Sequence, residues 1–342
     1  MDILQKNSEW LYITPIYQLE IDDVLKGEIS IGRVSFIDIK KLSRIRKRIG
    51  LPIVLSEIEN KFKGANFFKE SKTYALLPFS GIPELIENDC RKKIEDAVNI
   101  ISVSQLGYCS RSNNSQFGLI KQRSDVSRMF IKKNVFECHL NISVENKILP
   151  FHLNDSWLKF HKKFFFFDLI KLISSKDKIQ KKWKDTIIRA AIMSGKSMQS
   201  RDLEYCFLWN MIIIEMLLTE QGDKYSESLS ERSEAFIGWV GYWKENNYEE
   251  SIKKLYSKRC QFVHDGYSNA ITINDVLFAE DIVFNILYNI IKHIKLFPSK
   301  QSVIDFSDKV KAEKLLKIVP KTQPKTLKFM RRTRNDDELK RI

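Results

Sequence analysis

The stretch Leu255-Tyr256-Ser257-Lys258-Arg259-Cys260-Gln261-Phe262-Val263-His264-Asp265-Gly266 decides how the second half of this chain is interpreted. It predicts a helix that ends at Gly266, because glycine commonly follows the last residue of a helix. Residues five apart on such a helix project about 140° from each other, so Arg259 and His264 lie near each other without stacking. A permanent cation beside a group that changes charge near neutral pH suits the handling of phosphate esters. The alternative is a histidine near the helix C-terminal dipole and a solvated arginine.

The region around this stretch is built to be helical. From Ser156 onward proline is absent until Pro298, and apolar residues recur at helical spacing. We expect helices at Trp157–Ile173, Gln180–Ser194, Asp202–Leu218, Ser228–Trp243, Tyr248–Val263 and Asn274–Leu296. Asn274-Asp275 is the expected N-cap region of the last helix. The sequence therefore predicts an all-α bundle over residues 156–297.

Residues 1–155 have a different character. Aromatic and β-branched residues with partial alternation predict strands, and Pro83 followed by early acids predicts the start of a helix. The expected strands are Trp10–Ile13, Glu28–Phe36, Tyr74–Leu77 and Val135–Val144, with a helix at Ile82–Ala97. The predicted fold class is α+β, with a strand-rich sensing or regulatory domain at 1–155 before the helical bundle.

The charge of the chain makes a polyanion a reasonable partner. The 342 residues carry a formal net charge of +14, and residues 298–342 hold thirteen Lys and Arg against six Asp and Glu. We expect this segment to be a basic C-terminal tail. The candidate phosphate-binding residues are Lys40, Lys41, Arg44, Arg46, Lys47, Arg48, Lys258, Arg331, Arg332 and Arg334. The alternative is a solvated basic face and a solubilising end.

Cysteine usage and hydropathy favour a cytoplasmic protein. The five cysteines are scattered without a CxxC pair, so neither a disulfide framework nor a zinc ribbon is expected. The N-terminal sequence lacks the pattern of a signal peptide, and the apolar runs are too short to span a membrane. We therefore expect no membrane association.

Three other chemistries fit the sequence poorly. Gly195-Lys196-Ser197 resembles the end of a P-loop, but Ala190 stands where the first glycine is required and the preceding residues look helical. Cys138-His139 and the pair Cys260 and His264 offer possible metal ligands, but no further pair is placed to complete a tetrahedral shell. Cys260 lies one helical turn from His264, which leaves a cysteine nucleophile as a less favoured alternative.

Four features occur in a fixed order within the helical region. Glu215 is an acid inside the apolar run Ile212–Leu218, and such an acid requires a cation or donor when buried. Arg232 follows in Leu229–Ser233, and the Arg259-x4-His264 element comes last. This order resembles the ApeA-like branch of the HEPN superfamily over about residues 181–296. Its members carry an embedded glutamate, a serine-x-arginine type helix start and an arginine, four residues, histidine motif.

The resemblance implies a HEPN-like helical bundle that forms a homodimer with two arginine/histidine pairs at a shared cleft. It further implies a metal-independent endoribonuclease that acts as a toxin or in antiviral defence, without a cofactor. His264 would act as general base or acid and Arg259 would bind the scissile phosphate. Glu215 would orient Arg259, and Arg232 and Asp265 would support the site.

One residue departs from the family pattern. Active members commonly carry a polar residue directly after the arginine, where this chain has Cys260. Some members of the superfamily bind nucleic acid or an antitoxin without cleavage, so a non-catalytic binding module is the alternative. The expected partners are RNA, a second copy of the chain, and an antitoxin or phage-derived trigger.

Overall fold

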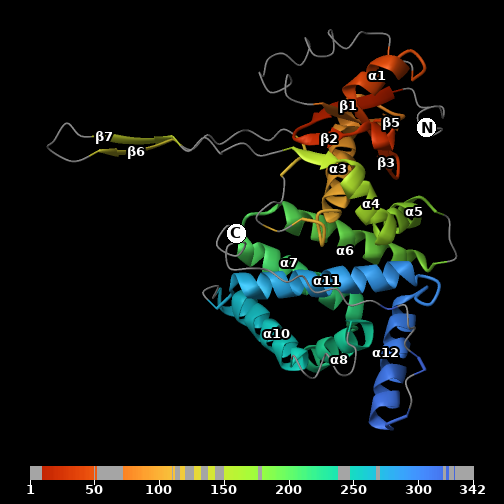
Figure 1. Ribbon diagram of the computed structural model, residues 1–342, viewed down its shortest axis with the longest axis vertical. Coiled ribbons are helices and arrows are strands. Elements are labelled where there is room, and N and C mark those ends of the chain that lie inside the picture. Colours follow the sequence, from red (N-terminus) through yellow and green to blue (C-terminus); the bar gives the residue numbers. More distant parts are fainter. Residues whose placement is uncertain are drawn as a thin grey trace. The chain divides into compact units, whose positions relative to one another are not determined.

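The computed structural model describes residues 10–49, 51, 72–109, 111, 116–119, 127–131, 138–142, 150–175, 179–237, 247–266, 270–318, 321–322 and 327. Within these residues the protein is α+β, with a small antiparallel sheet in the N-terminal region and helices mostly in the C-terminal region (Figure 1). The chain divides into two compact units, Met1–Glu95 with Ser115–Asp155 and Asp96–Asn114 with Ser156–Ile342. The predicted α+β class is confirmed.

A four-stranded antiparallel sheet forms the centre of the first unit. Its strand order is β1-β5-β4-β3, where the strands are β1 (Trp10–Ile16), β3 (Glu28–Ile31), β4 (Val34–Asp38) and β5 (Thr73–Phe79). The prediction of one strand over Glu28–Phe36 was wrong. The chain reverses at Gly32, whose φ of 57° is a left-handed conformation that glycine adopts without strain.

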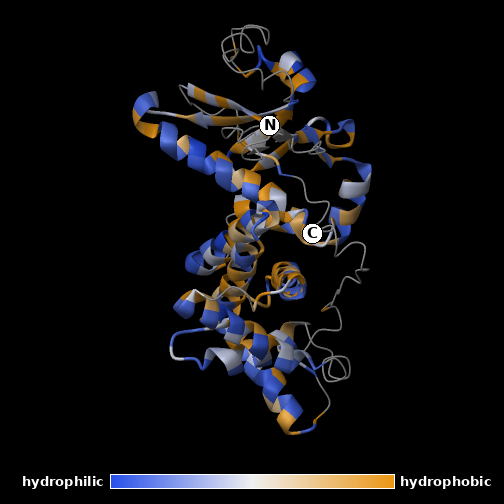
Figure 2. Cartoon of the chain, turned by 90° about the vertical axis from the view of Figure 1, so that its left-hand side faces the viewer, coloured by the Kyte–Doolittle hydropathy of each residue, from blue (hydrophilic) through white to orange (hydrophobic). Residues whose placement is uncertain are grey.

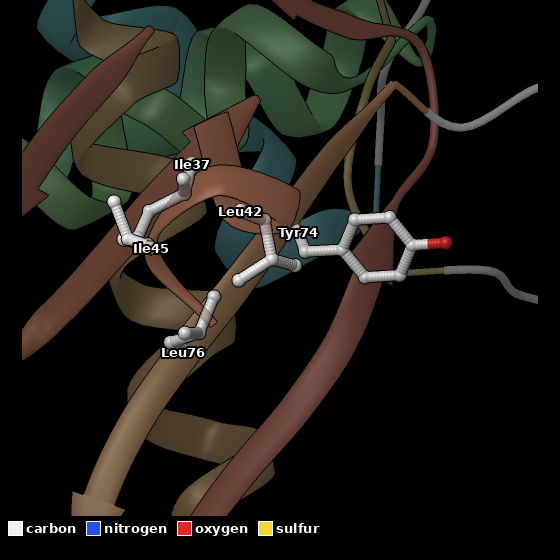
Figure 3. Close-up of a cluster of buried hydrophobic side chains, with 5 residues drawn as sticks. All are labelled: Ile37, Leu42, Ile45, Tyr74 and Leu76. Carbon is white, nitrogen blue, oxygen red and sulfur yellow. The ribbon is translucent and has the colours of Figure 1, made fainter. Parts of the chain in front are cut away.

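Helix α1 (Ile39–Ile45) covers part of this sheet. The Asp38 side chain caps its N-terminus by accepting hydrogen bonds from the backbone N–H groups of Lys40 and Lys41. The apolar side of α1 is buried against β4 and β5, in a cluster that Figure 3 shows: Ile37, Leu42, Ile45, Tyr74 and Leu76. The basic segment at residues 40–48 therefore lies on and just after an amphipathic helix.

The remaining elements of the first unit are short strands and the start of one long helix. β2 (Leu19–Ile21) pairs in parallel with β8 (Phe151–Leu153), and β6 (Ser127–Ile131) pairs antiparallel with β7 (Cys138–Ile142). The rest of the predicted strand Val135–Val144 lies outside the described residues. Helix α3 (Pro83–Val103) begins at its proline and continues six residues past the predicted end at Ala97, into the second unit.

The second unit is helical. Its helices are α4 (Asp155–Lys163), α5 (Phe166–Ser174), α6 (Lys181–Gln199), α7 (Leu203–Leu218), α8 (Tyr225–Ile237), α10 (Tyr248–Asp265), α11 (Ile273–Lys292) and α12 (Lys300–Leu315). Helix α11 is buried over most of its length and packs on α7 and α8. The other helices carry both hydrophilic and hydrophobic residues, as Figure 2 shows.

Two predicted helix ends agree closely with the structure. Asp202 caps α7 by accepting from the N–H groups of Glu204 and Tyr205, and Gly266 follows α10 with a φ of 65°. The Gly195-Lys196-Ser197 segment lies inside α6, which agrees with the rejection of a P-loop. A Cβ atom at Gly195 would lie 1.8 Å from the carbonyl oxygen of Asn99, so this glycine permits direct contact between α6 and α3.

Three predictions about the helices were wrong. The segment Trp157–Ile173 is two helices, because the chain breaks after Lys163 and turns its phenylalanines into the core. The N-cap of α11 is Thr272, whose side chain accepts from the N–H of Asp275 in a capping box. The basic segment after Pro298 begins with a full helix, α12, which starts at a second capping box formed by Ser299 and Ser302.

Candidate active site

The Arg259 guanidinium and the Glu215 carboxylate form the centre of the site. Arg259 Nε lies 3.0 Å from Glu215 Oε1, and Arg259 Nη2 donates to Glu215 Oε2 over 3.1 Å. The two side chains come from α10 and α7 and remain 20% and 13% exposed. Burial raises the pKa of the Glu215 carboxyl, and the neighbouring Arg259 charge opposes that rise. The pair is therefore partly desolvated, and part of the Arg259 side chain remains exposed.

The pairing leaves part of the guanidinium available. Glu215 lies within ion-pair distance of Nε and accepts a hydrogen bond from Nη2, and Nη1 donates no hydrogen bond to any residue that the structure describes. An arginine held along one edge by a carboxylate can present its other nitrogen to a phosphate oxygen. Glu215 thus fixes the position of Arg259 without consuming all of its donors.

His264 lies in the last turn of α10, and its side chain is exposed. No hydrogen bond or ion pair joins it to Glu215, Arg259 or any other residue in the described ranges. Helix α10 is continuous from Arg259 to His264, so their side chains project about 140° apart around its axis. Asp265 ends the helix and is also exposed.

Two further side chains lie on α10 between the directions of Arg259 and His264. At 100° per residue, Tyr256 and Cys260 project between them. The Cys260 thiol is a neighbour of the Tyr256 hydroxyl, and the Tyr256 ring packs edge-on against Tyr225 with centroids 6.3 Å apart. Burial, the neighbouring Cys260 thiol and the nearby charge of Glu215 raise the pKa of Tyr256 to about 12. Its hydroxyl therefore keeps its proton.

The Arg232 guanidinium is bound by neighbouring protein groups. Its guanidinium is 10% exposed, donates to the carbonyl of Leu218 over 2.7 Å, and binds both carboxylate oxygens of Asp223 at 2.5 and 3.1 Å. These contacts join α8 to the end of α7 and to the turn between the two helices. The hydrogen bond with Arg232 helps to hold the pKa of Asp223 below its usual range, against the opposing effect of burial. Arg232 thus holds α8 against the end of α7, the helix that carries Glu215.

The candidate phosphate-binding cations differ in their surroundings. Lys258 Nζ lies 2.7 Å from Asp275 Oδ2 at the start of α11, and Lys41 Nζ lies 2.9 Å from Glu28 Oε2. Arg46 is half-buried, whereas the remaining basic residues of this segment are exposed: Lys40, Arg44, Lys47 and Arg48. These residues belong to the first unit and not to the unit that holds Arg259. Arg331, Arg332 and Arg334 lie outside the described residues.

Sequence reasoning missed Tyr256 and Asp223 as members of this region. Tyr256 precedes Arg259 by three residues and Cys260 by four, a spacing that places all three on adjacent parts of one helix surface. That spacing was a usable signal. The partner of Arg232 could not be read in the same way, because Asp223 lies in the turn between two helices, where no periodicity applies.

Comparisons with protein-family models, curated proteins and solved structures return no match. Within the described ranges, no group of three His, Cys, Asp or Glu side chains is arranged to hold a metal ion. A search of the same residues finds no helix with the length and apolar character needed to cross a bilayer. The case for a function therefore rests on the side chains of α7 and α10.

Proposed function

We propose that this protein is a metal-independent endoribonuclease of HEPN type, acting as a homodimer through its helical bundle. The observation that carries the proposal is the arginine of α10, held by Glu215 with one nitrogen available, on the same helix as the exposed His264. Arg259 would bind the scissile phosphate and stabilise the charge that develops on its oxygens. Toxin action or antiviral defence is the proposed biological context.

The chemistry needs one proton acceptor and one proton donor. A base removes the proton of the ribose 2′-hydroxyl, whose oxygen attacks phosphorus and forms a 2′,3′-cyclic phosphate. An acid gives a proton to the 5′-oxygen as the P–O bond to it breaks. One chain offers a single exposed His264 in this region. Two copies would supply two histidines and two arginines, which is why the proposal includes a homodimer.

The test is RNA cleavage by purified protein in the presence of a metal chelator. We expect the wild type to cut RNA and to leave 2′,3′-cyclic phosphate ends, and we expect His264→Ala and Arg259→Ala to lose activity by a hundredfold or more, on the order of the usual contribution of one catalytic group. Lys254→Ala is the matched control, because Lys254 is an exposed cation on the same helix. Undiminished cleavage by His264→Ala would show that the assignment is wrong.

A second candidate is a non-catalytic module that binds nucleic acid. The observation in its favour is the group of exposed cations on and after α1. RNA retention that weakens steeply with salt, without any cleavage product from the wild type, would support this candidate over the nuclease. Loss of retention in a variant with Lys40, Arg44 and Lys47 changed to serine would assign the binding to α1.

A further inference from the structure

Tyr256 occupies a position in the candidate site that the arginine/histidine motif does not account for. On α10, Arg259 projects about 60° to one side of Tyr256 and His264 about 80° to the other. The Tyr256 hydroxyl is near enough to Glu215 and Arg259 for their charges to act on it. The tyrosine thus lies in the sector that a bound phosphodiester would cross in passing from Arg259 to His264.

Among the residues that the structure describes, the Tyr256 hydroxyl has the Cys260 thiol as a neighbour and no strong acceptor bound to it. A thiol sulfur is a poor hydrogen-bond acceptor, whereas a phosphate oxygen carries negative charge and accepts strongly. The hydroxyl remains protonated at every pH at which the protein would act, since its pKa is raised to about 12. The hydroxyl can therefore donate a hydrogen bond to a charged acceptor. The Tyr256 ring packs against the ring of Tyr225.

We propose that Tyr256 is a substrate-binding residue whose hydroxyl donates a hydrogen bond to a phosphate oxygen of RNA. The inference rests on the proposed function and deepens it. The ligand class is a single-stranded phosphodiester, positioned between Arg259 and His264.

Binding and cleavage are measured separately to test this role. In the His264→Ala background, where RNA stays intact, we expect Tyr256→Phe to weaken the affinity for a short single-stranded RNA by roughly ten- to a hundredfold, as for one hydrogen bond to a charged group. With His264 present, Tyr256→Phe should raise KM more than it lowers kcat. The unfolding midpoint of Tyr256→Phe should match the wild type, because the ring remains.

Tyr225→Phe is the matched control, since it removes a hydroxyl from the other ring of the same pair. Equal losses of affinity in Tyr256→Phe and Tyr225→Phe would overturn the inference by showing an effect of the ring pair. Cleavage by the wild type with unchanged affinity in Tyr256→Phe would overturn it as well, while leaving the nuclease intact. A wild type that neither binds nor cuts RNA would instead refute the proposed function and, with it, this inference.

Discussion

At the scale of single residues, the pair of Arg259 and Glu215 shows that a buried acid needs a neighbouring cation. Glu215 lies on an otherwise apolar helix and is 13% exposed, so its charge has lost much of its hydration. Arg259 compensates from a separate helix, 44 residues later. The acid within Ile212–Leu218 predicted such a cation, and the family resemblance indicated Arg259, which is the residue that Glu215 contacts.

Removing the Arg259 side chain should therefore lower the free energy of unfolding, because the Glu215 charge would remain buried without a cation. We expect Arg259→Ala to destabilise the protein at pH 7 by about 1–3 kcal/mol, the usual cost of a buried polar group left without a partner. Because the folded-state pKa of Glu215 is raised above its ordinary value of 4.5, its protonated form is favoured in the fold, and this loss should shrink as the pH falls toward 4.5. Urea denaturation at both pH values measures the difference.

The double variant Arg259→Ala/Glu215→Gln is the control for this prediction. A glutamine carries no charge to desolvate, so the double variant should be more stable at pH 7 than Arg259→Ala alone. If the double variant is less stable than the single one, burial of the Glu215 charge is not the cause of the loss.

His161 is a second residue whose surroundings set its charge. Its side chain is 2% exposed among the rings of Tyr108, Trp157, Phe160 and Phe166, and burial lowers its pKa to about 3. Between pH 3 and 6.5 the unfolded chain therefore binds a proton that the folded protein does not. Stability should fall as the pH drops through this window, by at most about 1.4 kcal/mol per pH unit from this group.

Thermal or urea unfolding across pH 4 to 7 measures this slope. His161→Phe should make the slope shallower, because it removes the titrating group and keeps a ring in the aromatic cluster. His152→Phe is the control, since His152 is exposed in the other unit. Equal slopes in the wild type and His161→Phe would show that His161 does not contribute to the acid sensitivity.

At the scale of elements, local signals decided which predictions succeeded. Gly266 marked the end of α10 because a cap acts within a few residues of itself. The break between α4 and α5 has no such marker, because the aromatic run around Phe164 packs into a core that only the folded chain creates. Helix α12 was missed because its many lysines suggested a tail, while its ion pairs to α8 through Glu231 and Glu234 are tertiary.

The crossing of α6 and α3 gives a prediction at the scale of elements. A methyl group at Gly195 would lie 1.8 Å from the backbone oxygen of Asn99, where no side chain can move aside. We expect Gly195→Ala to destabilise the protein by about 3 kcal/mol or more through overpacking, although alanine favours a helix. Urea denaturation, with far-ultraviolet circular dichroism as the signal, provides the measurement.

Gly222→Ala separates overpacking from backbone strain. Gly222 has a φ of +95° and open space around its Cα, so an added methyl group meets no neighbour there. Its substitution should cost about 1–2 kcal/mol through the unfavourable φ alone. A Gly195→Ala variant no less stable than Gly222→Ala would show that the two helices can separate at little cost.

At the scale of the whole molecule, the second unit is assembled from segments that lie apart in the sequence. Residues 96–114 belong to it although the strands of the first unit surround them in the chain. Arg111 is the clearest link: its Nε lies 2.9 Å from Glu280 Oε1 of α11, and both of its Nη atoms donate to the Ser197 carbonyl at the end of α6. Both charged side chains are about 95% buried. No local pattern predicts this contact, because its cause is the tertiary arrangement.

The buried pair should be sensitive to the loss of one partner and more tolerant of the loss of both. We expect Arg111→Met and Glu280→Met each to cost about 3–5 kcal/mol, since each leaves a buried charge without its counterion. The double variant should cost clearly less than the sum of the single ones, which a double-mutant cycle in urea would measure. Arg91→Met, which breaks the exposed pair with Glu95, should change stability by no more than about 1 kcal/mol. Additive losses in the double variant would mean that Arg111 stabilises the unit through the α6 carbonyls and that its charge pairing with Glu280 contributes little.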